Sequence, residues 1–171
     1  MSFKVAILTA SDRSARGERE DLSGKVIEEI VKEMGGRVFE KIVVSDDLQE
    51  LQSALIRLAD EVGVDLVLTT GGTGLAPRDL TPEATRAVIE KEVPGIAEAM
   101  RAAGLKKTPH AMLSRALCGV RGQTLIINLP GSPKAVKENL EAISAALPHA
   151  LELLKGKVTD CAEGAGRGSK E

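Results

Sequence analysis

A glycine-rich segment near the middle of the chain combines residue types suited to phosphate chemistry. Residues 71–74 contain three glycines and the hydroxyl of Thr73, and they follow the short apolar run 66–68. Glycines free the backbone to point several N–H groups at one anion. Arg78 and Asp79 then supply a positive charge and an oxygen ligand within a few residues. This order predicts phosphate binding assisted by a hard cation such as Mg²⁺, which prefers carboxylate oxygens.

Two other loops carry groups of the same kind. Asp46 follows a second apolar stretch, and its neighbour Asp47 is placed to cap the next helix, which leaves the Asp46 carboxylate for a ligand. Ser132 and Pro133 are typical of a helix start, where free N–H groups and the positive helix end can receive an anion. We therefore interpret Asp46 and Asp79 as the carboxylates of a metal-assisted phosphate site.

Each of these features also has a purely structural interpretation. Glycines after a strand often form tight turns, and aspartates in loops often cap helices. Thr81, followed by Pro82, is expected to cap the helix that begins there. Asp12 and Arg13 on the first loop are equally consistent with an ion pair that has no part in chemistry. The glycine segment is neither a Walker loop nor the dinucleotide fingerprint.

The hydrophobic pattern predicts the elements that must position these groups. Continuous apolar runs of the kind found in buried parallel strands end in small or polar residues. Three such runs cover residues 4–8, 66–68 and 125–127, and we interpret residues 37–44, which lead into Ser45-Asp46-Asp47, as a fourth strand of this kind. Segments with helical spacing separate them, over residues 22–34, 48–62 and 82–91. The alternation predicts a single doubly wound α/β domain, with a mostly parallel sheet and helices on both faces.

The second half of the chain is expected to add an antiparallel edge to this sheet. Residues 95–103 have helical spacing. Residues 117–121 and 124–129 are joined by Gly122 and Gln123, and we interpret them as a hairpin.

The domain is predicted to span residues 1–157. Its last helix begins at Ser132, bends at Pro148 and ends near Lys155. Residues 158–171 are polar and glycine-spaced, which predicts a flexible C-terminal tail.

The same elements predict where the polar loops meet. In an open α/β sheet, ligands bind outside the carboxyl ends of the strands, near the point where the strand order reverses. The loops that follow the predicted strands contain residues 9–13, 45–47, 69–79 and 128–134. If the strands are parallel, these loops share one edge of the sheet, and Asp46 and Asp79 lie on the same side of the molecule.

Composition excludes several classes of function. The 171 residues are 43% hydrophobic but only 1% aromatic, so the stacking platforms of proteins that bind single-stranded nucleic acid are missing. A net charge of -2 does not indicate the strongly basic surface that binds DNA or an anionic membrane. The N-terminal apolar stretch is too short to span a membrane, and two distant cysteines fit a reducing compartment. We expect a cytoplasmic protein without nucleic-acid or membrane partners.

Together, the motifs resemble those of the molybdenum cofactor biosynthesis proteins of the molybdopterin adenylyltransferase type. The resemblance covers residues 4–155 in order and spacing. It is carried by Thr69-Thr-Gly-Gly-Thr-Gly74 with Arg78-Asp79 and Thr81-Pro82, by Pro94-Gly95, by Ser114-Arg115 and by Asn128-Leu-Pro-Gly-Ser-Pro133. It implies transfer of AMP from Mg-ATP to the terminal phosphate of molybdopterin, with release of pyrophosphate.

The resemblance also implies roles for individual residues. Asp46 and Asp79 become the catalytic carboxylates that hold Mg²⁺. Contacts to the two substrates, ATP and molybdopterin, are implied for a set of loop residues. This set comprises Ser11, Asp12, Arg13, Gly71, Gly72, Thr73, Gly74, Ser114, Arg115, Pro130, Gly131 and Ser132. Family members form trimers or hexamers, so a homotrimer or hexamer is implied, together with hand-over to a molybdenum-inserting protein.

Two other functions stay open on the sequence alone. A binding or carrier module would hold molybdopterin and pass it on without chemistry. A generic α/β phosphate-binding enzyme would act on another nucleotide or on a phosphosugar. Pyrophosphate release distinguishes the carrier from adenylyl transfer, and stabilisation by ligands other than molybdopterin would favour the generic enzyme.

Overall fold

A mixed sheet of six strands forms the centre of the computed structural model, which describes residues 2–157. The strands are β1 (Phe3–Ala10), β2 (Gly36–Val44), β3 (Leu66–Thr70), β4 (Lys91–Glu92), β5 (Cys118–Arg121) and β6 (Thr124–Leu129). Their order is β2-β1-β3-β6-β5-β4, and the first four in that order pair in parallel. β5 pairs antiparallel with β6, and β4 pairs antiparallel with β5. The predicted parallel sheet with an antiparallel edge hairpin is confirmed.

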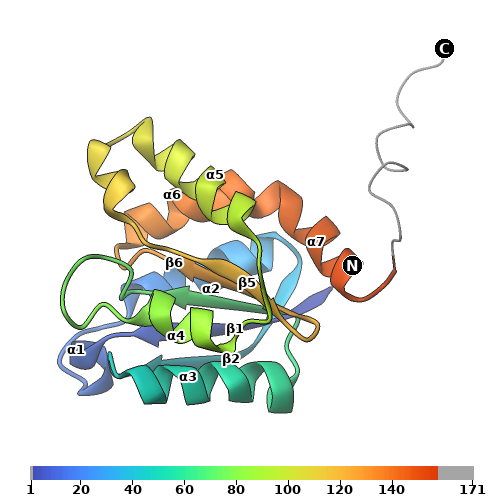
Figure 1. Ribbon diagram of the computed structural model, residues 1–171, viewed down its shortest axis with the longest axis horizontal. Helices are drawn as coiled ribbons and strands as arrows, with labels where there is room; N and C mark the ends of the chain where they lie inside the picture. Colours follow the sequence, from blue (N-terminus) through green and yellow to red (C-terminus); the bar gives the residue numbers. More distant parts are fainter. Residues whose placement is uncertain (1, 158–171) are drawn as a thin grey trace.

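Helices cover both faces of this sheet (Figure 1). One face carries α3 (Leu48–Ile56), its π-helical continuation η1 (Arg57–Val62) and α4 (Thr81–Val88). The other face carries α2 (Leu22–Glu33), α5 (Pro94–Leu105), α6 (Pro133–Ile143) and α7 (Leu147–Leu154). The short elements α1 (Asp12–Ala15), η2 (Pro109–Leu113) and η3 (Ser144–Ala146) complete the fold. The predicted doubly wound arrangement is therefore correct.

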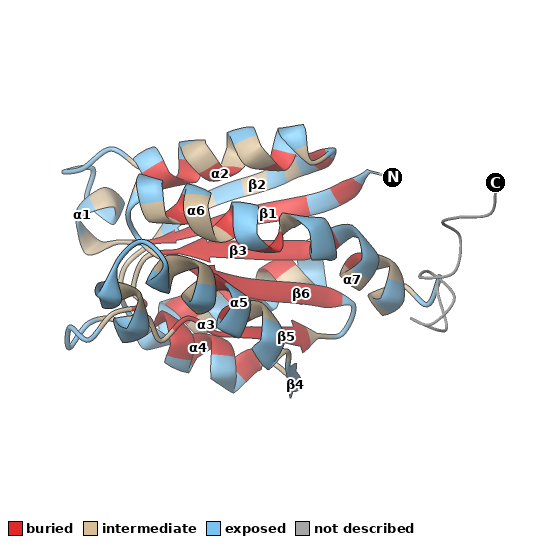
Figure 2. Ribbon diagram, turned by 90° about the horizontal axis from the view of Figure 1, so that it is seen from above, coloured by how far each residue is buried: buried red, intermediate tan, exposed pale blue. Residues whose placement is uncertain are grey.

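Strand β1 shows how the sheet divides the core into two layers. Val5 and Ile7 belong to the apolar cluster that includes α2 and α6, whereas Ala6 and Leu8 belong to the cluster with α3 and α4. All four side chains are completely buried. Burial on both faces is expected for a central parallel strand, whose side chains alternate between the faces. Figure 2 shows the same continuous burial along β3 and β6.

Two predictions about α4 are wrong. The helix begins at Thr81, but its N-cap is Leu80 and no side chain caps it, so Thr81 is not the capping residue. The helix ends at Val88 rather than at residue 91, because the chain continues into β4 and pairs with β5. Edge-strand pairing supplies the backbone hydrogen bonds that a further helical turn would have made.

The C-terminal helical region is broken before Pro148 rather than at it. The 3₁₀ turn η3 separates α6 from α7, and Pro148 lies in the first turn of α7, where its missing N–H costs little. Ser132 is the N-cap of α6, as predicted, because its hydroxyl accepts a hydrogen bond from the Ala135 N–H at 3.2 Å. None of the helices within residues 2–157 is long and apolar enough to cross a membrane. The predicted tail, residues 158–171, lies outside the described residues.

Candidate functional site

A cavity of about 480 Å³ opens at the carboxyl ends of β1 and β3. The strand order reverses there, since β2 lies on one side of β1 and β3 on the other. Nine predicted site residues line it, namely Ser11, Asp12, Arg13, Asp46, Gly71, Gly72, Asp79, Gly131 and Ser132. Thr73, Gly74, Ser114, Arg115 and Pro130 are not among its lining residues. Loops that follow four different strands therefore converge, and both predicted carboxylates lie at one cavity.

The loop after β1 holds Asp46 in place. Asp46 Oδ2 accepts a hydrogen bond from the Asp12 N–H at 3.0 Å, and the Asp46 N–H donates to Asp12 Oδ1 at 3.0 Å. Asp46 Oδ1 takes no part in these two bonds. Burial raises the pKa of the Asp46 carboxyl, and the carboxylates of Asp12 and Asp79 act in the same direction. Asp47 caps α3 as predicted, by accepting from the Glu50 N–H at 2.9 Å, and leaves Asp46 at the cavity.

The glycine loop and Arg115 hold Asp79. Asp79 Oδ2 accepts a hydrogen bond from the Ala76 N–H at 3.0 Å. Arg115 Nη2 donates to the Asp79 carbonyl oxygen at 2.6 Å, and Arg115 Nε donates to the Gly74 carbonyl oxygen at 2.8 Å. The Arg115 backbone N–H also donates to the Thr73 carbonyl oxygen at 2.9 Å. In this structure Arg115 therefore braces the loop instead of lining the cavity.

Gly71 and Gly72 allow β3 to end in a tight turn beside β1. Both have positive φ, +91° and +69°, a conformation that favours glycine. A Cβ atom on Gly71 would lie only 2.4 Å from the Ala10 carbonyl oxygen. The Gly71 N–H already donates to the Leu129 carbonyl oxygen at 3.2 Å. An anion bound at this turn would therefore accept hydrogen bonds from the backbone N–H groups that follow Gly71.

Asp12 at the cavity forms an ion pair with a residue from another loop. Its partner is Arg78 and not the sequence neighbour Arg13, through contacts of 2.6 and 2.9 Å. These hydrogen bonds lower the pKa of the Asp12 carboxyl.

The carboxylates at the cavity suit a cation that binds together with substrate phosphates. Within residues 2–157, no group of three or more His, Cys, Asp or Glu side chains is arranged to hold a metal ion. Two carboxylates are nevertheless sufficient for Mg²⁺ when substrate phosphates and water complete its shell.

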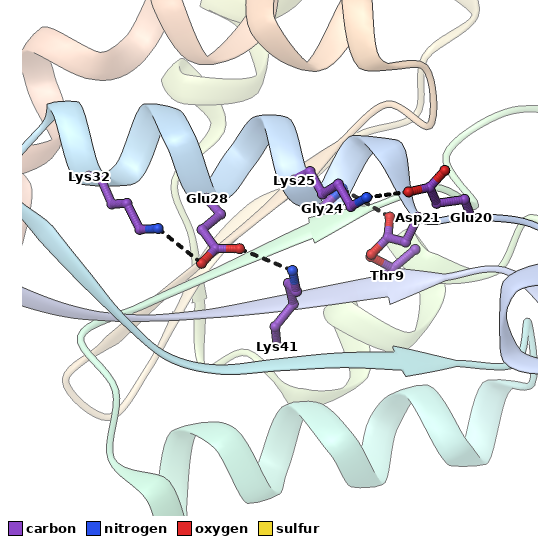
Figure 3. Close-up of polar contacts among 8 residues, drawn as sticks. All are labelled: Thr9, Glu20, Asp21, Gly24, Lys25, Glu28, Lys32 and Lys41. Atoms are coloured by element: carbon purple, nitrogen blue, oxygen red, sulfur yellow. Dashed lines mark hydrogen bonds and ion pairs between the residues drawn. The ribbon is translucent and has the colours of Figure 1, made fainter.

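The start of α2 forms a cavity wall that the sequence interpretation missed. Asp21 caps α2 by accepting from the Gly24 N–H at 2.9 Å, and it also accepts from Thr9 Oγ1 at 2.7 Å (Figure 3). Ser23 Oγ donates to the Gly131 carbonyl oxygen at 2.5 Å and ties this wall to the start of α6. Asp21, Thr9 and Ser23 all line the cavity. An aspartate directly before a predicted helix is a capping signal, but its pairing with Thr9 has no local signature.

Comparison with known proteins shows similarity along most of the chain. The family model described as "Probable molybdopterin binding domain" matches residues 6–149. A curated molybdopterin adenylyltransferase from Helicobacter pylori strain J99 is 47% identical over 157 residues, which cover 91% of this chain and 89% of the relative. The molybdopterin adenylyltransferase of Escherichia coli K12 is 37% identical over 175 residues, covering 94% of this chain and 90% of the relative.

A solved structure agrees with these sequence comparisons. The crystal structure of the molybdopterin biosynthesis enzyme MoaB from Thermus thermophilus matches with a TM-score of 0.86 at 53% identity. The match covers 90% of this chain and 97% of that chain. The resemblance inferred from the motifs is confirmed over nearly the whole domain.

Proposed function

Because the chain belongs to the molybdenum cofactor biosynthesis family, we propose that it is a molybdopterin adenylyltransferase. In this reaction an oxygen of the terminal phosphate of molybdopterin attacks the α-phosphorus of ATP. The bond from that phosphorus to the bridging oxygen breaks, and pyrophosphate leaves. The names of the curated relatives support this activity. The observation that carries the proposal is that Asp46 and Asp79, from different loops, line one cavity at the topological switch point.

Asp46 and Asp79 would hold Mg²⁺, which would neutralise phosphate charge during the transfer. The residues around them fix these carboxylates. Asp12 binds the backbone and one carboxylate oxygen of Asp46, and Arg115 binds the carbonyl oxygen of Asp79. Nucleotidyl transfer leaves little covalent work to the protein, so alignment and charge stabilisation supply most of the catalysis.

Positive groups among the residues that line the cavity suit the phosphates of the substrates. Arg13 and Arg19 line the cavity, as do Gly131 and Ser132 at the start of α6. The N-terminus of a helix carries partial positive charge and free N–H groups, which favour a bound phosphate. We infer that these positive groups bind substrate phosphates while the carboxylates hold the cation.

The assay that tests the proposal measures pyrophosphate release with ATP, Mg²⁺ and molybdopterin. We expect release only when all three are present, with adenylylated molybdopterin as the second product. A molybdopterin carrier would bind the pterin, detected as a rise in melting temperature, and release no pyrophosphate. A melting temperature that rises with other phosphorylated ligands but not with molybdopterin would identify a different phosphate-binding enzyme.

The family resemblance also supports proposals about assembly, location and extent. We propose a cytoplasmic homotrimer or hexamer that hands its product to a molybdenum-inserting protein. Light scattering measures the assembly, and a monomer at micromolar concentration would contradict it. We further propose that residues 1–157 form the molybdopterin-binding α/β domain. A chain that ends at residue 157 should therefore keep the pyrophosphate-release activity of the full chain.

A further inference from the structure

The hydroxyl of Thr81 is buried without a hydrogen-bond partner. Thr81 has no exposed surface, and its Oγ1 is the one buried side-chain nitrogen or oxygen within residues 2–157 that lacks a partner. Such groups are rare, because a buried hydroxyl that loses its hydrogen bonds to water pays a desolvation cost. Other buried threonines are satisfied, since Thr85 Oγ1 accepts from Asn128 Nδ2 at 2.9 Å and Thr124 Oγ1 donates to the Val64 carbonyl oxygen at 2.7 Å.

Helix capping does not explain this hydroxyl. Threonine at a helix start usually accepts a hydrogen bond from a backbone N–H of the first turn. Here α4 has no side-chain cap, and Thr81 lies one residue inside the helix, after the N-cap Leu80. The Thr81 backbone N–H instead donates to the Gly72 carbonyl oxygen at 3.2 Å. This bond fixes the start of α4 against the glycine turn.

The hydroxyl and the Asp46 carboxylate approach the same point beside Gly72. A Cβ atom on Gly72 would lie 2.4 Å from Thr81 Oγ1 and 3.5 Å from Asp46 Oδ1. Both oxygens therefore border the position that a side chain at residue 72 would take, although they form no hydrogen bond with each other in this structure. The two hydrogen bonds between Asp46 and Asp12 use Asp46 Oδ2 and the Asp46 backbone N–H. Asp46 Oδ1 takes part in neither of them.

We propose that Thr81 is a positioning residue for Asp46, and this proposal rests on the proposed metal-assisted function. When the carboxylate takes up a divalent cation, Asp46 Oδ1 comes within hydrogen-bond distance of Thr81 Oγ1 beside Gly72 and accepts its hydrogen. Thr81 is fully buried and is not among the residues that line the cavity, so its role is to position Asp46 rather than to bind a substrate. Its effect is to hold the second carboxylate oxygen as firmly as Asp12 holds the first.

The test compares the binding of ATP with and without Mn²⁺ by calorimetry, using Mn²⁺ as the probe for the divalent cation. The ratio of the two affinities isolates the contribution of the metal. In Thr81→Val the hydroxyl is replaced by a methyl group of similar size, and we expect this ratio to fall about 10-fold, as is typical when a partner of a metal ligand is removed. The melting temperature without metal should stay equal or rise, because an unsatisfied polar group is removed.

Two matched variants separate positioning from packing. Thr81→Ser keeps the hydroxyl and should restore the ratio of the wild type. Thr124→Val removes a hydroxyl that has a partner, so it should lower the melting temperature and leave the ratio unchanged. A wild-type ratio in Thr81→Val, or an equal loss in Thr81→Ser, would overturn the positioning role.

The same measurements show whether a failure concerns the role of Thr81 or the proposed adenylyl transfer. If the wild type releases no pyrophosphate but Thr81→Val still lowers the ratio, adenylyl transfer is wrong and the positioning of Asp46 stands. If Mn²⁺ does not strengthen ATP binding to the wild type, both the metal site and the role of Thr81 are wrong.

Discussion

Asp46 and Asp79 line the same cavity but are held by opposite kinds of partner. Asp46 exchanges two hydrogen bonds with Asp12, another acidic residue, in the loop after β1. Asp79 is held at its carbonyl oxygen by the guanidinium of Arg115, which comes from the segment before β5. Two carboxylates with the same proposed task should therefore respond differently when their supports are changed.

The two supports are nevertheless connected. Arg78, from the same loop as Asp79, forms two hydrogen bonds with the Asp12 carboxylate. Asp12 in turn binds Asp46. A chain of contacts thus runs from one carboxylate to the loop of the other, and it joins the loops that follow β1, β2 and β3. Variants that break single contacts in this chain test how far the two carboxylates act as one site.

The largest expected effect follows from removing either carboxylate. Asp46→Asn and Asp79→Asn should each fold normally, because neither side chain belongs to the apolar core. Each should lower pyrophosphate release by about 10²–10³-fold, since a group that stabilises developing charge is lost. The matched control is Asp47→Asn, which keeps its capping role because asparagine caps as well as aspartate. Adenylylation at the wild-type rate by Asp79→Asn would show that Asp79 is not a metal ligand.

A smaller effect is expected from the support of Asp79. Arg115→Lys keeps a positive charge but loses the planar fork that binds two loop carbonyls. We expect turnover to fall about 10-fold through misplacement of the loop, and the free energy of unfolding to fall by about 1–2 kcal/mol. Arg121→Lys is the control, because Arg121 binds Asp60 and the Val88 carbonyl oxygen away from the cavity. Equal losses of turnover in both variants would argue against a specific support.

The melting temperature should depend on pH through the partly buried carboxyl of Asp46. The folded-state pKa of Asp46 is raised by burial, so this group favours folding below its unfolded pKa and loses that contribution as the pH rises through the folded pKa. Asp46→Asn should therefore melt about 1–2 °C higher than the wild type at neutral pH without divalent ions. The difference should vanish as the pH falls through the folded pKa of Asp46. Melting curves between pH 3 and 8 measure it.

Asp12 should show the opposite sign and the smallest effect. Hydrogen bonds from Arg78 lower the pKa of Asp12, so its contribution to stability is present above the unfolded pKa and is lost as the pH falls through the folded pKa. Asp12→Asn should melt slightly lower than the wild type at neutral pH, with a difference that shrinks toward acid. Added salt should reduce the difference further, because Arg78 is exposed and its ion pair is screened. A difference of the same sign in the Asp46 and Asp12 variants would contradict the contrast between their environments.

The sequence by itself determined the sheet, the site edge and two capping residues. Continuous apolar runs that end in polar residues are local features, and they specify the buried strands β1, β3 and β6, whose carboxyl ends must meet. The expectation of burial on both faces is wrong for β2, which lies at the edge of the sheet and is exposed at alternate residues. The convergence of Asp46 and Asp79 at one cavity follows from that rule. Asp47 and Ser132 were also identified correctly, because a cap is decided by residues only three positions apart.

Only the tertiary structure decided which polar groups meet within the site. Arg115 reaches the glycine loop from a distant segment, Asp12 pairs with Arg78 rather than with its neighbour, and the Thr81 hydroxyl faces Gly72 instead of capping α4. Sequence spacing carries no information about such contacts, because they depend on how closely two loops approach after the core has packed. Tertiary packing likewise replaced the last predicted turn of α4 with strand β4, since an edge of the sheet was available to pair.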